Sequence, residues 1–256
     1  MLQAKLKGLN RFNLFMAMLH FLQGVLVLAI SDPSKGVVPI TISYLKFEVS
    51  TQKLLPTVTT LGEVNLAWFV VLFFFLSSLA HLFIGTVYKK NYEKNVEKGI
   101  NKVRWFEYAL SASVMMVAIS LLSGIYDISS LLMIFTLDAL MNLLGLAMEV
   151  HNQDHKNVNW LTYILGCVAG IVPWIVFGIY VYGARTYGGG NIPDFVYWIY
   201  VSIFVFFNSF AINMILQYKK IGPWKDYLYG ERVYIILSLV AKSLLAWQVF
   251  AGTLRP

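Results

Sequence analysis

The 256-residue chain has one cysteine, seven prolines and few charged side chains. Cys167 alone cannot form an intramolecular disulfide, and a single thiol excludes the paired cysteines of CxxC zinc and redox motifs. Charged residues make up 13% of the chain, about half the share of a typical soluble domain. The scarcity of charge also excludes a disordered chain, which needs the opposite composition.

Apolar residues are what the chain has in excess. Hydrophobic types make up 58% of the sequence, and the mean hydropathy is +0.66. A soluble globule could not bury that much apolar surface, so the composition predicts an integral membrane protein. The net charge of +7 does not predict a nucleic-acid partner, because such binding needs a basic patch on a folded surface.

Seven apolar stretches are long enough to cross a bilayer as helices, which takes about 20 residues. They cover approximately residues 12–30, 64–87, 103–125, 129–150, 158–182, 195–216 and 233–252. The short connections leave no room for a second domain. The predicted fold is an all-α membrane protein, a single seven-helix domain over residues 1–256.

The connection at residues 31–62 is longer and has strand character. Two apolar series of opposite phase alternate with polar residues: Ile40, Ile42 and Tyr44, then Leu45, Phe47 and Val49. This pattern predicts a short β-hairpin outside the membrane, with these series forming either two strands or one strand with a bulge.

Basic residues are distributed unevenly between the two sides of the predicted bundle. The side that holds the N-terminus has 14 of the 20 lysines and arginines, the opposite side has five, and Lys242 lies within the last span. The basic residues on the N-terminal side are Lys5, Lys7, Arg11, Lys89, Lys90, Lys94, Lys98, Lys102, Arg104, Lys156, Lys219, Lys220, Lys225 and Arg232. By the positive-inside rule the N-terminus is cytoplasmic and the C-terminus extracellular.

The first apolar stretch follows three basic residues, as in a signal peptide. Its length of about 19 residues exceeds the apolar core of a signal peptide, which has about 7–15. It also carries His20 and Gln23. We therefore expect it to remain as the first membrane helix.

Lys242 lies about ten residues from either end of the last span, too deep for its stem to reach a boundary. An unpaired ammonium there costs about 2.5–3.5 kcal/mol on insertion scales. A structural pair with a carboxylate is one interpretation. The other is an amine that burial makes suitable for forming a Schiff base with an aldehyde.

A buried protonated Schiff base needs an anion, and three carboxylates lie within predicted spans: Glu107, Asp138 and Glu149. Glu149 lies near the cytoplasmic end, where a solvated interfacial position is expected. Glu107 shares a helix face with Arg104 and Ser111, at spacings of three and four residues. A plain ion pair between Glu107 and Arg104 is the alternative role for this carboxylate.

Further polar residues repeat the same helical spacing on other spans. They are His20 and Gln23, Ser77 and His81, Asp138 with Met141 and Asn142, and Ser238 one turn before Lys242. Each pair alone is compatible with a satisfied core hydrogen bond. Together they predict one interior polar network, because lipid would penalise each of them separately.

A lysine in the middle of the seventh helix, with a carboxylate on the third, resembles a retinal-binding rhodopsin. The cytoplasmic N-terminus and the long loop with strand character are similar to heliorhodopsins, and this resemblance covers the whole chain. The motifs that carry it are Arg104-x-x-Glu107-x-x-x-Ser111, Ser238-x-x-x-Lys242, His20 with Gln23, and Ser77 with His81.

The resemblance implies all-trans retinal bound covalently to Lys242 as a protonated Schiff base, with Glu107 as its counterion. Ser238, Ser111, Ser77 and Arg104 would surround the Schiff base, and His20, Gln23 and His81 would form an internal cluster that accepts its proton. The retinal pocket would include Tyr108, Asp138, Met141, Asn142 and Trp247. Asp138 departs from the family pattern, in which a neutral amide is expected, and if it were ionised near retinal it would compete with Glu107. The family also implies a homodimer and an unknown cytoplasmic signalling partner.

A proton pump needs a donor eleven residues after the acceptor on the third helix, and that position is Ala118. The sequence therefore favours a light sensor over a pump, with no enzymatic activity and no metal site. Two alternatives stay open: a light-gated ion channel or transporter, and a retinal-free transporter or receptor for small molecules.

Overall fold

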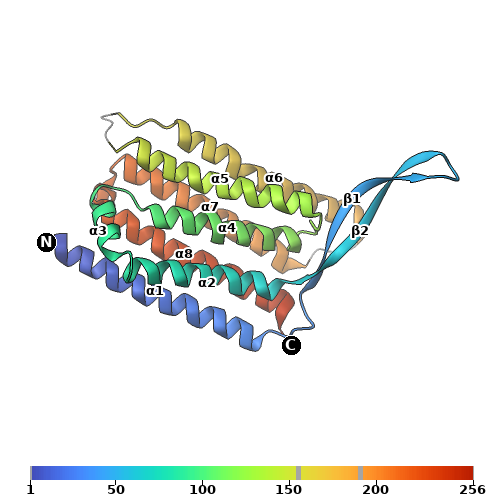
Figure 1. The fold of residues 1–256 in the computed structure, drawn as a ribbon, viewed down its shortest axis with the longest axis horizontal. Helices are drawn as coiled ribbons and strands as arrows, with labels where there is room; N and C mark the ends of the chain where they lie inside the picture. The colour runs from blue at the N-terminus through green and yellow to red at the C-terminus, as the bar shows by residue number, and fades with distance from the viewer. Residues whose placement is uncertain (1, 154–156, 190–192, 256) are drawn as a thin grey trace.

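Seven long helices form the body of the protein in the computed structural model, which describes residues 2–153, 157–189 and 193–255 (Figure 1). They are α1 (Leu2–Ile30), α2 (Leu66–Gly85), α4 (Lys102–Leu122), α5 (Ile128–His151), α6 (Leu161–Tyr187), α7 (Asp194–Tyr218) and α8 (Tyr227–Val249). A π-helical turn, η2 (Phe250–Leu254), continues α8. Within the described residues, these seven helices are long and apolar enough to cross a membrane. The all-α seven-helix prediction is confirmed.

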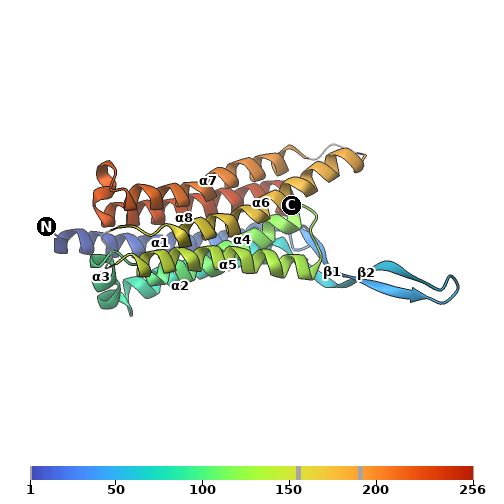
Figure 2. The ribbon, with the colours of Figure 1, turned by 90° about the horizontal axis from the view of Figure 1, so that it is seen from above.

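The helices are arranged in a ring. Each packs on the next, in the order α1, α2, α4, α5, α6, α7 and α8, and α8 packs back on α1. The N-terminus lies at one end of the bundle, while the C-terminus lies at the other end with the hairpin (Figures 1 and 2). Of the seven helices, α4 is the most buried, so its side chains reach the interior of the bundle.

Four helices begin at a side chain that caps their free backbone N–H groups. The capping oxygens belong to Asn65, Asn101, Asp127 and Asp226, which accept hydrogen bonds from the backbone N–H of Ala67, Arg104, Ser130 and Leu228 respectively. Such caps stabilise a helix end by about 1 kcal/mol. The backbone hydrogen bond from Ser130 lowers the pKa of Asp127, so this cap is ionised at neutral pH.

Two helix starts differ from the predicted spans. The first helix begins at Leu2 rather than near residue 12, and α8 begins at Tyr227 rather than near residue 233. The earlier start of α8 places Glu231 inside the bundle. A further short helix, α3 (Lys89–Glu97), forms in the basic loop after α2 and buries Tyr92 and Val96. One residue of the predicted charge pattern, Lys156, lies outside the described residues.

The predicted hairpin exists as two antiparallel strands, β1 (Val37–Glu48) and β2 (Lys53–Asn65). Both apolar series lie in β1 except for Val49, which follows the last residue of the strand, so the interpretation that they form two strands is wrong. The register shifts between Ile40 and Thr41, not where the apolar phase changes. The outer half of the hairpin is mostly exposed on both faces. The alternation of apolar and polar residues there therefore does not mark a buried face of the strand.

Candidate functional site

The centre of the bundle holds a buried ion pair between α8 and α4. Lys242 is 3% exposed and Glu107 is 8% exposed, and Lys242 Nζ lies 3.0 Å from Glu107 Oε1. The ammonium also lies 5.4 Å from the centre of the Tyr108 ring. The lysine therefore has a carboxylate partner at short range, which offsets part of the cost of burying its charge.

Serine hydroxyls complete the surroundings of this ion pair. Lys242 Nζ donates to Ser238 Oγ at 2.8 Å, one turn earlier on α8, and Ser77 Oγ of α2 donates to Glu107 Oε1 at 2.6 Å. Ser111 is fully buried one turn after Glu107 on α4. Three predicted serines thus lie on the helices that carry or face the pair, as the spacings suggested.

Two histidines stack beside this pair, from the first two helices. The rings of His20 and His81 are nearly parallel, with centroids 5.6 Å apart. His81 Nδ1 lies 2.7 Å from Asn13 Oδ1, whereas neither nitrogen of His20 has a hydrogen-bond partner within the described residues. The third predicted member, Gln23, instead accepts a hydrogen bond from Trp247 Nε1 at 3.3 Å. The structure brings together the histidines but gives Gln23 a different partner.

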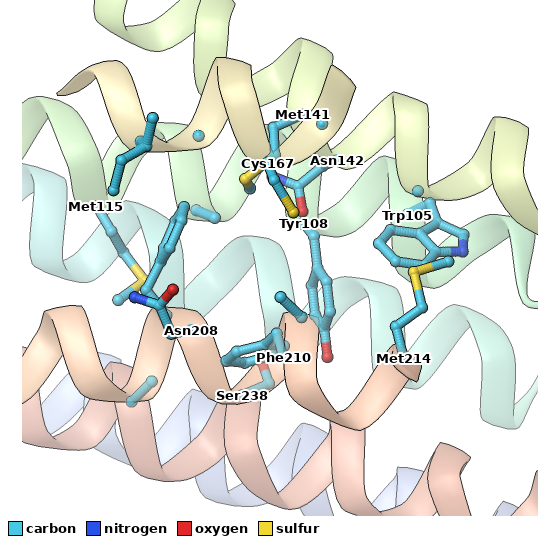
Figure 3. A pocket seen from close by; sticks show the side chains of 18 of the residues that line it. Trp105, Tyr108, Met115, Met141, Asn142, Cys167, Asn208, Phe210, Met214 and Ser238 are labelled. Carbon is cyan, nitrogen blue, oxygen red and sulfur yellow. The ribbon is translucent and has the colours of Figure 1, made fainter. Parts of the chain in front are cut away.

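An apolar cavity extends from Lys242 between α4, α5, α6, α7 and α8 (Figure 3). Of the predicted pocket residues, Tyr108, Met141 and Asn142 line it, together with Ser238 and Lys242. Other lining side chains include Trp105, Met115, Trp174, Phe207, Phe210 and Met214. The aromatic and methionine side chains leave an apolar space with one amine in its wall.

Two glycines let bulky side chains approach this cavity closely. A Cβ on Gly145 would lie 2.4 Å from the Trp105 ring, and a Cβ on Gly170 would lie 2.4 Å from Met141 Sδ. Real Cβ atoms do not come that close to other atoms. Because Gly145 of α5 and Gly170 of α6 have no side chain, Trp105 and Met141 can occupy these positions in the cavity wall.

The guanidinium of Arg104 does not pair with Glu107, so the alternative role of Glu107 as its ion-pair partner is wrong. Arg104 donates instead to Glu149 of α5 and to Glu231 of α8. Glu149 is 3% exposed rather than solvated, because Arg104, Trp105 and Tyr227 all donate to it. Helix packing decides these partners. Arg104 lies one turn before Glu107, where α5 and α8 bring their own carboxylates.

The sequence comparisons identify the family of the chain. Residues 9–254 match the family description Heliorhodopsin. The chain belongs to the heliorhodopsin family. No curated protein sequence matches it. Among solved structures, it is similar to cyanorhodopsin from the cyanobacterium Tolypothrix sp. NIES-4075, with a TM-score of 0.64, 12% identity and coverage of 95% of this chain and 94% of that one. At that identity the likeness shows a shared fold, which is the rhodopsin fold.

Membership of the heliorhodopsin family makes this a multi-pass membrane protein of the retinal photoreceptor type. The chain has the groups that such a chromophore needs. The cavity offers an apolar, aromatic-lined space, and a lysine amine stands in its wall beside a carboxylate. An aldehyde with a long apolar polyene fits these groups, because the amine can bind the aldehyde and the cavity can hold the polyene. Lys242 would hold it, while the rings of Trp105, Tyr108 and Trp174 would flank it.

Two residues predicted for the heliorhodopsin pocket do not line the cavity in the described part of the chain. Trp247 lies five residues after Lys242, which is about 140° further around α8, and it turns toward Gln23 of α1. Asp138 is fully buried against α4, where Ser113 Oγ and Asn142 Nδ2 donate to its carboxyl at 3.1 and 3.2 Å. In both cases the position around the helix directs the side chain away from the cavity.

In this heliorhodopsin, Gly145→Ala is expected to reduce retinal loading. The new methyl group would push the Trp105 ring into the cavity, since the two cannot share the space. The visible absorbance per protein after incubation with retinal measures the loss. Gly183→Ala is the control, because a Cβ there meets no atom within 4 Å. Equal retinal loading in both variants would contradict this role of Gly145.

Proposed function

We propose that this protein is a light sensor that binds all-trans retinal covalently through Lys242 and keeps the Schiff base protonated. The observation that carries the proposal is the buried pair of Lys242 and Glu107 at one wall of an aromatic cavity. Retinal, when bound, supplies light absorption and a change of shape on isomerisation. The remaining chemistry belongs to side chains of the chain itself.

Glu107 is the proposed counterion, because it lies within hydrogen-bond distance of Nζ. The Ser77 hydroxyl fixes the orientation of this carboxylate from α2. Ser238, one turn before Lys242, accepts from Nζ and so orients the nitrogen in the dark state. The contacts of Nζ with Glu107 and Ser238 support a proton that stays on Nζ in the dark and leaves only after retinal isomerises.

The stacked pair of His20 and His81 is the proposed acceptor of that proton. An imidazole has an ordinary pKa of about 6.5, so a histidine can take up and return a proton near neutrality. Both rings are buried, which keeps the proton away from bulk water. Gln23, the third residue expected in this cluster, hydrogen-bonds to Trp247 and not to either histidine in the described part of the chain.

The same proton would return to Lys242 without crossing the membrane. Ala118, at the position of a pump donor, is fully buried, and Met115, Met116 and Ile119 around it on α4 are buried and apolar. This part of the helix offers no titratable side chain for vectorial transfer. We therefore favour a light sensor over a pump. A light-gated channel is the alternative, and the photocurrent measurement described below distinguishes it from a sensor.

The proposed orientation places the N-terminus in the cytoplasm and the C-terminus outside. Most basic residues belong to the N-terminal end of the bundle, including those of α3 and its flanks.

We also propose a homodimer that signals through a cytoplasmic partner. The resemblance to the heliorhodopsin family supports both of these statements.

Replacing His20 or His81 by Phe should change the rise or decay of the deprotonated intermediate after a flash. The dark absorption band should change little, since within the described residues Lys242 Nζ hydrogen-bonds to Glu107 and Ser238 and to neither ring. Flash photolysis measures the intermediate, and a pH dye in the bulk should report almost no net proton release in the wild type. A sustained light-driven pH gradient in vesicles, or a steady photocurrent, would refute the sensor and favour transport.

A further inference from the structure

A second group of buried charges lies one helical turn from Glu107, toward the N-terminal end of α4. It joins Arg104, Glu149 and Glu231, none of which is more than 4% exposed. The two terminal nitrogens of Arg104 donate to one carboxylate each. Among the ion pairs of the described residues, no other cation contacts Glu149 or Glu231. Two buried carboxylates therefore share one guanidinium.

The formal charges of this cluster do not balance, because two carboxylates face one guanidinium. An uncompensated carboxylate is very unfavourable in a buried site, and binding one proton removes the excess charge. Glu149 accepts from Trp105, Tyr227 and the backbone N–H of Asn101, in addition to Arg104. Glu231 accepts from fewer donors. Hydrogen bonds to a carboxylate favour its ionised form, so Glu231 is the carboxylate with less support for a negative charge.

The groups that face Glu231 come from several elements. They are Arg104 of α4, Glu149 of α5, Tyr92 of α3, Asn101 before α4, and the nearby phenols Tyr227 and Tyr234 of α8. Burial raises the pKa of the Tyr92 phenol well above its usual value. Tyr92 therefore keeps its hydroxyl proton and acts as a neutral hydrogen-bonding group.

A continuous chain of hydrogen bonds links Glu231 to the histidine pair. Tyr92 Oη lies 3.2 Å from Glu231 Oε1, Asn13 Nδ2 lies 3.4 Å from Tyr92 Oη, and Asn13 Oδ1 lies 2.7 Å from His81 Nδ1. All four side chains are buried. Glu231 and His81 also line one small cavity of about 20 Å³, together with the charged side chains of Glu107 and Arg104. That is enough space for one water molecule, which needs about 10–15 Å³.

The hydrogen bonds of this chain can run in either direction. When His81 Nδ1 donates, Asn13 donates to Tyr92, and Tyr92 donates to an ionised Glu231. When Glu231 is protonated and donates to Tyr92, the phenol rotates and the Asn13 amide turns over, which breaks the hydrogen bond from Asn13 Nδ2 to the Leu9 carbonyl at 3.0 Å. His81 Nδ1 then becomes an acceptor. A doubly protonated His81 cannot accept, so it conflicts with a protonated Glu231. Each end of the chain therefore opposes a proton at the other end.

We propose that Glu231 is a proton-binding site of this protein, and that Tyr92 and Asn13 couple it to His81. The proton on Glu231 makes His81 a poor holder of a second proton, which speeds the return of the light-released proton to Lys242. Only this kinetic part rests on the proposed photoreceptor function. The protonation of Glu231 is a property of the dark protein, with or without retinal.

Infrared spectroscopy of the dark apoprotein tests the protonation. To remove one other buried carboxyl group, the spectra are taken in an Asp138→Asn background. The carbonyl band of a protonated carboxylic acid should be present and should disappear in Glu231→Gln. Tyr92→Phe should shift this band, whereas Tyr227→Phe should not, because Tyr227 donates to Glu149 instead. A band that survives Glu231→Gln, or that shifts only with Tyr227→Phe, would overturn the assignment.

Flash photolysis of the retinal-loaded protein tests the coupling with the same two variants. Tyr92→Phe should lengthen the deprotonated state by about fivefold, the effect expected from the loss of one hydrogen bond between neutral groups. Tyr227→Phe also removes a phenol from the cluster, but it leaves the chain to His81 intact. Equal lifetimes in the two variants would refute the coupling. A missing visible band would instead count against retinal binding and would leave the infrared result standing.

Discussion

Lys242→Ala is expected to abolish covalent retinal binding completely. The substitution removes the amine in the cavity wall, and among the residues that line the cavity there is no other lysine. Absorption spectra after incubation with all-trans retinal should show free retinal only. A variant that still carries covalently attached retinal would contradict the assignment of Lys242.

The same variant should also lose stability, because it leaves the Glu107 carboxylate buried without its cation. Removing one partner of a buried ion pair costs about 3–5 kcal/mol. Glu107→Gln combined with Lys242→Ala removes both charges and should restore most of that loss. Thermal unfolding of the single and double variants therefore separates a loss of binding from a loss of folding.

Glu107→Gln is expected to move the visible band of the retinal-loaded protein to longer wavelength. The carboxylate stabilises the positive charge at Nζ in the ground state more than in the excited state, in which that charge moves away. The proton at Nζ should also be lost at lower pH, by one unit for each 1.4 kcal/mol of lost attraction. Spectra recorded across a pH titration measure both effects.

Asp138→Asn is the matched control for the counterion. It also removes a buried carboxyl group, but one that contacts Ser113 and Asn142 rather than Lys242. The amide can keep both neighbours, so the absorption band should stay near its wild-type position. A large shift with Asp138→Asn and none with Glu107→Gln would make Asp138 the counterion.

The bundle was predictable because bilayer thickness fixes the length of apolar helices. Hydropathy therefore located all seven helices, but it misplaced the ends that continue into water. The polar residues Lys5 and Lys7 lie on α1, and the basic segment of α3 forms a helix whose apolar side is Tyr92 and Val96. Short amphipathic helices among charges give no such hydropathy signal.

The candidate site was predictable only within single helices. Spacing on α8 predicted that Ser238 and Lys242 share a face, and the structure joins them at 2.8 Å. Spacing on α4 left an ion pair between Glu107 and Arg104 as an alternative, but the packing of α5 and α8 supplies Glu149 and Glu231 to Arg104 instead. Glu231 was missed because it lies before the apolar stretch. Its spacing of seven residues from Ser238 and eleven from Lys242, which places all three on one face of α8, was the local signal.

Locating the retinal attachment by mass spectrometry tests the proposed photoreceptor most directly. The wild-type apoprotein is incubated with all-trans retinal, and borohydride then makes any lysine linkage permanent before digestion. We predict a visible band before reduction and a retinal-derived mass on the peptide that contains Lys242. The absence of a band, or an adduct on another lysine with Lys242 unmodified, would contradict the proposed site.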